Sequence, residues 1–177
     1  MNAKFDIYLK LDGIQGESTV KGHEKEIVVL SFEQAIDATV ITSGGGGSSS
    51  VGKATFSGLR FRKPLDKSSI PLMLACASCK HIKTAWFSFH RSGTHLDFYT
   101  VSLEDVVVTH VAQRAGTGTQ YPLSFDTLSS GVDTTEFLDE VTFRYGKIEW
   151  GYAPMNPNGT AAPPVKGGWN VAANKKL

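Results

Sequence analysis

The sequence predicts a mainly β protein: a β-barrel of two antiparallel sheets with one short α-helix on its flank and an extended glycine-rich loop. Apolar and polar residues alternate with a period of two in several segments, which is typical of strands that bury one face. Short turn-forming sequences separate these segments, and only one segment favours a helix. With 177 residues, 41% of them hydrophobic, we expect a single domain over residues 1–177.

The first strand is expected at Phe5–Leu11, because apolar residues there alternate until Asp12 and Gly13 form a turn. The polar segment 16–25 is expected to be a loop. Alternation resumes at Ile27 and gives two faces. The more apolar face carries Val28, Leu30, Phe32 and Ile36. The other face is half polar, as expected beside water or a wet channel, and carries Val29, Ser31, Glu33 and Ala35.

Residues 37–52 are expected to form the extended loop, since four consecutive glycines and several serines favour no regular element by themselves. Residues 47–53 also match the first seven positions of a phosphate-binding loop. That loop needs Ser or Thr next, to hold magnesium, and this chain has Ala54. A strand pattern follows instead of a helix, so a flexible loop is favoured over a nucleotide site.

The next elements are a strand and the helix. Thr55–Phe61 alternates with a change of phase near Gly58, as a bulge would cause. Ser69–Cys79 is the helix candidate, with a serine cap and Pro71 in its first turn. A helix of this length is marginal alone, so it must pack on the rest of the protein.

Strand patterns return in the second half of the chain. They cover residues 84–89, 96–103, 105–114 and 137–152, with a hairpin turn at 92–95. The apolar phase changes at Gly146, which indicates a bulge or a barrel corner. Residues 153–177 contain four of the seven prolines, so an irregular C-terminal tail is predicted, although 165–171 can dock on the sheet.

No catalytic, cofactor-binding or metal-binding residues are predicted. Cys76 and Cys79 lack a second cysteine pair, so packing of Cys76 in the core is favoured over a redox or zinc role. The five histidines are dispersed along the chain. His23 is near Glu24 and Glu26 and could bind a metal, but a surface hydrogen-bonding role is favoured.

Charge and hydropathy exclude several classes of partner. The net charge of +1 gives no reason to expect nucleic acid. No apolar run approaches the roughly 20 residues that span a bilayer, so membrane insertion is not expected. The amino terminus has no secretory signal pattern, which predicts synthesis in the cytoplasm and, if the protein is exported, a route without a signal peptide.

A series of short segments recurs along most of the chain: 6–10, 14–18, His23 with Glu26 and Ile27, Phe61 with Lys63, 66–68, 71–76 with Lys80 and His81, 103–108, and 168–170. In this order they resemble the hemolysin-coregulated proteins, the inner-tube proteins of bacterial type VI secretion systems. No single segment is diagnostic, but their order and spacing are specific to the family.

The resemblance implies a compact β-barrel whose six copies close into a ring. Rings stack into an exported tube that carries effector proteins and contacts the tip and sheath of the apparatus. The family's tube domain has no enzymatic activity, and the tube leaves the cell through the apparatus itself.

On this interpretation Val29, Ser31 and Glu33 are the candidates for lining the lumen and contacting cargo. The candidates for ring stacking lie in the extended loop: Ser43, Gly44, Gly45, Gly46, Gly47, Ser48 and Gly52. Two other classes stay open from the sequence, a monomeric or dimeric carbohydrate-binding β-sandwich and a small hydrolase.

Overall fold

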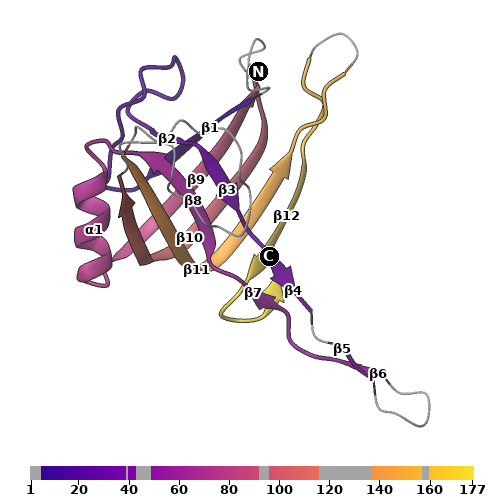
Figure 1. The fold of residues 1–177 in the computed structure, drawn as a ribbon. Helices are drawn as coiled ribbons and strands as arrows, with labels where there is room; N and C mark the ends of the chain where they lie inside the picture. The colour runs from indigo at the N-terminus through magenta and orange to yellow at the C-terminus, as the bar shows by residue number, and fades with distance from the viewer. Residues whose placement is uncertain (1–4, 39, 43–48, 92–95, 116–136, 157–159) are drawn as a thin grey trace.

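A computed structural model describes residues 5–38, 40–42, 49–91, 96–115, 137–156 and 160–177 (Figure 1). The single helix in this part of the chain is α1, Ser69–Ala77. The strands are β1 Phe5–Leu11, β2 Ile27–Val29, β3 Ser31–Glu33, β4 Ile36–Asp37, β5 Val40–Thr42, β6 Ser49–Val51, β7 Thr55–Phe56, β8 Leu59–Pro64, β9 His81–Arg91, β10 Leu96–Arg114, β11 Leu138–Tyr152, β12 Val165–Asn170 and β13 Lys175–Lys176. Within the described ranges, α1 is too short to cross a membrane.

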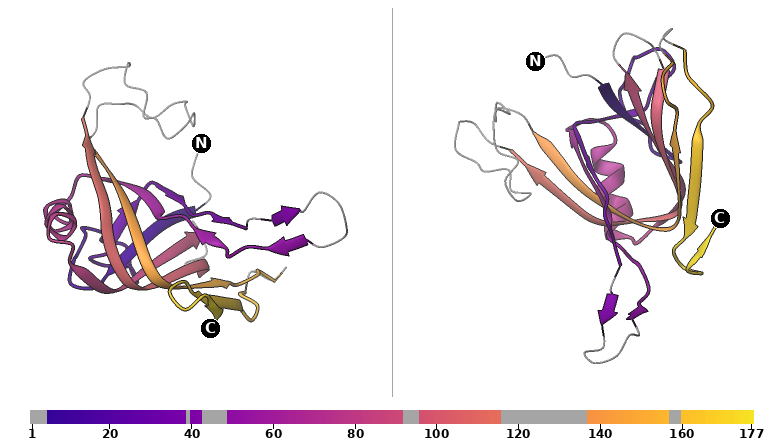
Figure 2. Two further views of the ribbon diagram at one scale, coloured as in Figure 1. Left: turned by 90° about the horizontal axis from the view of Figure 1, so that it is seen from below. Right: turned by 90° about the vertical axis from the view of Figure 1, so that its right-hand side faces the viewer.

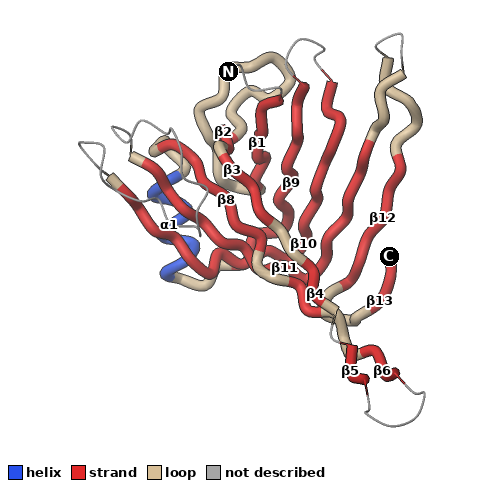
Figure 3. Tube along the Cα trace, turned by 45° about the vertical axis from the view of Figure 1, so that its right-hand side comes forward, coloured by secondary structure: helices blue, strands red, loops and turns tan. Residues whose placement is uncertain are grey.

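Nine strands form one antiparallel sheet that curls around the core, in agreement with the mainly β prediction (Figures 1 and 3). The order is β13-β12-β11-β10-β9-β1-β2, and β8 pairs with both β11 and β3. The first part of β11 pairs with β8 and its last part with β12, so the sheet branches along β11.

The chain itself joins the two ends of this curled sheet. β2 pairs with β1 and β3 pairs with β8, and only Leu30 separates β2 from β3. The Leu30 N–H donates a hydrogen bond to the Arg62 carbonyl at 2.8 Å. Among the described residues, the chain passing from β2 to β3 at Leu30 therefore closes the wall. No continuous ladder of hydrogen-bonded strands runs all the way round, as it would in the complete barrel that the sequence predicts.

Aromatic rings fill the inside of the wall. Phe87 is fully buried, and its ring centroid lies 5.2 Å from that of Phe32 and 5.5 Å from that of Phe61. Phe61 in turn contacts Phe143 at 4.9 Å. Because these rings come from β3, β8, β9 and β11, the core ties strands distant in sequence together by apolar burial and edge-to-face contacts.

The break at Leu30 overturns the predicted faces of β2. Val29 is buried in the core, whereas Val28 and Leu30 are exposed. Phe32 nevertheless points into the core as predicted. The bend at Leu30 shifts the alternation by one residue, so Val29 and Phe32 both face inward. Val29 thus cannot line a channel, and that part of the prediction is wrong.

The predicted extended loop is a protruding two-stranded ribbon (Figures 1 and 2). β4 pairs with β7, and β5 pairs with β6 farther out. The antiparallel pairing of the described arms supplies hydrogen bonds that neither arm has alone, which agrees with the expectation that the segment forms no regular element by itself. Ser43–Ser48 lie outside the described residues, and Gly52 is half-buried between β6 and β7.

The phase change predicted at Gly146 is confirmed, and β10 changes phase opposite to it. Tyr145 and Ile148 are both buried, as are Leu103 and Val106 on the paired strand. Asp105 has a φ of 54°, a conformation that L-residues rarely adopt. The pairing register of β10 and β11 does not shift across this point. The phase change is therefore a kink at the same place in both strands and not the effect of an inserted residue.

The docking of 165–171 on the sheet, which the sequence left open for the C-terminal tail, is present in the structure. β12 pairs with β11 from Tyr152↔Val165 to Lys147↔Asn170, and β13 pairs with the end of β12. Pairing with an existing long strand compensates for the weak alternation of this glycine-containing segment. The tail therefore extends the sheet.

α1 ends two residues before the prediction. Cys79 takes a φ of 50°, and the Lys80 N–H donates to the Ala75 carbonyl at 3.0 Å, which is a Schellman-type ending. Cys76 packs against the core as expected, while Cys79 is exposed; both thiols are free.

Candidate functional site

A continuous polar surface covers the outer side of β3, β8, β11 and β10, opposite the aromatic core. Residues paired directly across a ladder share a face. The pairings give two rows, Glu33–Arg60–Thr142–His110 and Ser31–Arg62–Glu140. The row between them, Phe32–Phe61–Val141–Val111, packs on the core. We call these seven outward residues the polar face.

Charges on the polar face are arranged with opposite signs side by side. The Glu140 Oε2 lies 3.7 Å from the Arg62 Nε and 3.5 Å from the Arg114 Nε. Burial lowers the pKa of the Arg62 guanidinium, and the neighbouring Glu140 carboxylate opposes that shift. The exposed Glu33 is paired across the ladder with the exposed Arg60. Such a surface can hold a ligand by charge and hydrogen bonds.

Two of the three predicted lumen residues belong to the polar face. Ser31 is half-buried and Glu33 is exposed on it, whereas Val29 lies in the core. Sequence reasoning missed the arginines on the neighbouring strand. The alternation of Leu59–Pro64, with Arg60 and Arg62 on the polar side, is the signal that could have found them.

A buried ionic cluster fixes the helix to the sheet. The fully buried Lys63 of β8 donates to the Asp139 Oδ2 at 2.9 Å and to the Ser69 Oγ at 2.9 Å, and it pairs with the Asp66 Oδ1 at 2.8 Å. Ser69, the first residue of α1, also donates to Asp139. The lysine charge thus holds two strands and the start of α1 in one arrangement.

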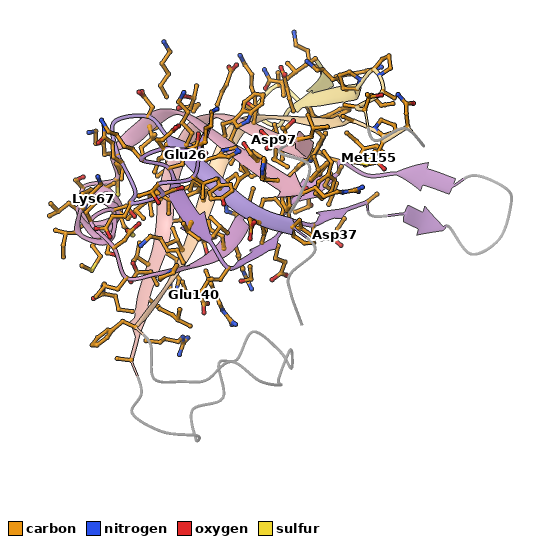
Figure 4. The ribbon with its side chains drawn as sticks, turned by 90° about the horizontal axis from the view of Figure 1, so that it is seen from above. Glu26, Asp37, Lys67, Asp97, Glu140 and Met155 are labelled. Carbon is orange, nitrogen blue, oxygen red and sulfur yellow. The ribbon has the colours of Figure 1, made fainter. Side chains whose placement is uncertain are left out.

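A second polar cluster joins histidines that are distant in sequence. His23 is buried, so its predicted place on the surface is wrong. Its Nδ1 lies 2.8 Å from the Glu26 Oε2. Its Nε2 lies 3.4 Å from the His90 Nδ1 and 3.3 Å from the Asp97 Oδ1. Figure 4 labels Glu26 and Asp97, which lie on the same side of the molecule, above Glu140 in that view.

The strand register explains this cluster. His90 of β9 is the cross-strand partner of Asp97 of β10, and their Nδ1 and Oδ1 atoms are 3.0 Å apart. Tyr8 of β1 stacks on the His23 ring with centroids 4.4 Å apart. Burial raises the pKa of the Tyr8 phenol, and the nearby carboxylates of Asp6, Glu26 and Asp97 add to that shift. No spacing in the sequence brings these residues together.

Known proteins resemble this chain over nearly its whole length. A family model described as "Type VI secretion system effector, Hcp" matches residues 8–152. Protein hcp1 of Pseudomonas aeruginosa is 29% identical over 172 residues, which is 96% of each chain.

Solved structures agree in fold. A structure described as that of a type six secretion system protein has a TM-score of 0.84 and 28% identity, covering 98% of this chain and 99% of that one. Hcp1 from Salmonella typhimurium has a TM-score of 0.75 and 25% identity, covering 99% and 100%. The family match over residues 8–152 and the similarity in fold lead to one conclusion: this chain belongs to the Hcp family of type VI secretion system proteins.

Proposed function

We propose that this protein is a structural subunit of the type VI inner tube, assembling as hexameric rings that stack, leave the cell through the apparatus and carry effector proteins in the lumen. Family membership supports a role in type VI secretion. On this proposal the protein is not an enzyme and needs no cofactor.

The observation that carries the ring proposal is a pair of separate apolar patches on the single chain. On α1, Ile70 and Leu74 are 58% and 64% exposed and lie one turn apart. Tyr152 and Val165, paired across β11 and β12, are 48% and 70% exposed. Figure 1 places α1 and β12 on opposite sides of the molecule. A ring of identical subunits needs two different patches that meet head to tail, and burial of both would remove them from water.

The polar face would form the wall of the channel. It presents both signs of charge without an exposed large apolar side chain among its seven residues. A protein that passes through the channel would contact hydrogen-bonding groups there instead of exposed apolar side chains. The protruding ribbon, with Gly52 and the segment 43–48 of the predicted stacking loop, would reach the next ring. Tip and sheath proteins would be the other partners.

The oligomeric state tests the ring directly. Native mass spectrometry of the purified chain is expected to show a six-subunit species. Leu74→Asp should shift it to monomers, because a carboxylate would be buried at each of the contacts. Val20→Asp, which changes an exposed apolar residue outside both patches, should leave the hexamer intact. A wild-type monomer or dimer that binds glycans would instead favour the carbohydrate-binding alternative.

Charge reversal on the polar face tests cargo contact. Glu33→Arg is expected to preserve hexamers while reducing the cognate effector retained in pull-down and secretion assays about tenfold, the effect of about 1.4 kcal/mol. Glu149→Arg changes an exposed carboxylate that is not part of the polar face and serves as the matched control. Equal retention by Glu33→Arg and the wild type would contradict a lumenal contact at this position.

A further inference from the structure

We propose that His23, His90 and Asp97 form a binding site for one divalent transition-metal ion, with Zn²⁺ as the preferred ion. This site is separate from the polar face and from both apolar patches. The Nε2 of His23, the Nδ1 of His90 and the Oδ1 of Asp97 converge, all within 4.8 Å of one another. Two imidazoles and a carboxylate are a ligand set that zinc and other first-row divalent ions accept.

The spacing of the three atoms matches one face of a zinc tetrahedron. Their separations are 3.4 Å, 3.3 Å and 3.0 Å. Bonds of about 2.0–2.1 Å in tetrahedral geometry place ligand atoms about 3.3–3.4 Å apart. The ion would therefore fit with sub-ångström adjustments, and the fourth position would remain for water or an outside ligand.

The hydrogen-bond pattern leaves an imidazole lone pair available for a metal ion. The Glu26 carboxylate only accepts hydrogen bonds, so the His23 Nδ1 that it contacts at 2.8 Å carries a proton. A neutral His23 then directs its Nε2 lone pair toward the His90 Nδ1, 3.4 Å away, and the Asp97 Oδ1, 3.3 Å away. A metal ion bound by these three atoms would take the place of the proton on the His90 Nδ1, which lies 3.0 Å from the Asp97 Oδ1. A carboxylate on the far nitrogen is also the usual partner of a metal-bound histidine, because it orients the ring.

Burial and access favour a stable site. His23 and His90 are each only 6% exposed, so the nitrogen ligands are preorganised. The Asp97 side chain is 34% exposed, which leaves a route for the ion. His23 comes from the loop between β1 and β2, whereas His90 and Asp97 belong to the β9–β10 pair. A bound ion would therefore fasten that loop to the sheet.

The test is metal titration of the untagged full-length protein after removal of metal with a chelator. Calorimetry with Zn²⁺ is expected to show one ion per chain, and Co²⁺ should give the intense visible absorption of a four-coordinate site. His90→Gln and Asp97→Asn should each weaken Zn²⁺ binding at least about tenfold, and Glu26→Gln about 10–100-fold. His81→Gln removes an exposed histidine paired with Asp105 and should change nothing.

NMR of the histidine rings in the wild-type protein tests the proposal without a substitution that could itself disturb folding. Zn²⁺ should shift the His23 Nε2 and His90 Nδ1 resonances in slow exchange, with the proton of His23 Nδ1 retained. The proposal is overturned if Zn²⁺ shifts the resonances of neither ring. It is equally overturned if folded His90→Gln and Asp97→Asn proteins bind Zn²⁺ as the wild type does.

Discussion

Lys63→Met is expected to lower the free energy of unfolding by about 3–5 kcal/mol. The methionine side chain nearly preserves the volume but removes the charge that Asp139 and Asp66 share. Asp139 is only 2% exposed, so its carboxylate would remain in the protein interior without its cationic partner. The Ser69 hydroxyl would also lose the donor that links it to β8.

Urea unfolding followed by circular dichroism measures this effect. The Leu74→Asp background is suitable, because the monomer expected for that variant would keep dissociation of the proposed ring out of the measured free energy. Lys147→Met removes an exposed pair, in which Nζ lies 2.7 Å from the Glu104 Oε2, and should leave the unfolding midpoint nearly unchanged. A loss below about 1 kcal/mol for Lys63→Met would mean that water reaches and solvates Asp139 after the substitution.

Gly16→Ala is the second large effect, with an expected loss of about 3 kcal/mol, at the upper end for overpacking. A Cβ at position 16 would lie 2.3 Å from the Glu26 carbonyl oxygen and 2.5 Å from the Ile27 Cα. Both contacts are to main chain, which cannot swing aside as a side chain can. The Gly16 N–H also donates to the Lys25 carbonyl at 2.8 Å, so separating the two segments breaks a hydrogen bond.

Thermal unfolding of Gly16→Ala should be compared with Gly167→Ala. An added Cβ at Gly167 meets no atom within 4 Å, so that variant should unfold within about 0.5 kcal/mol of the wild type. Gly16→Ala should also weaken Zn²⁺ binding, because the displaced segment carries His23. Two variants of equal stability would show that the 16–27 contact opens without strain.

The local sequence pattern was sufficient to predict a strand wherever one face of that strand contacts the core along its whole length. The alternation at Phe5–Leu11 and at Ala85–Phe89 predicted strands that the structure contains. Pro71 and the apolar run after it predicted the position of α1. The change in the phase of the apolar residues at Gly146 predicted the kink, which the buried residues on either side of it confirm. In each of these elements the neighbours along the chain determine which way a side chain points. The period of the apolar residues and the turn-forming residues are therefore enough to predict the element.

The sequence pattern did not predict the structure where pairing with a strand from elsewhere in the chain decides it. The bend at Leu30 arises because the strand leaves β1 for β8, and this exchange reversed the predicted face of Val29. The arms of the ribbon pair with each other, and 165–170 joins β11, although neither segment has a strong strand pattern. Long-range hydrogen bonding overrode weak local preference at these places.

The amino-acid sequence by itself determined the fold class, the helix, most strands, and Ser31 and Glu33 as members of a polar face, because these follow from the order of neighbouring side chains. Only the tertiary structure decided which strands share that face and which polar groups meet. His90 and Asp97 are joined by strand register, and His23 reaches them because the loop before β2 folds over β1. Convergence of three ligand atoms depends on distances between separate segments, which no periodicity along a single chain encodes.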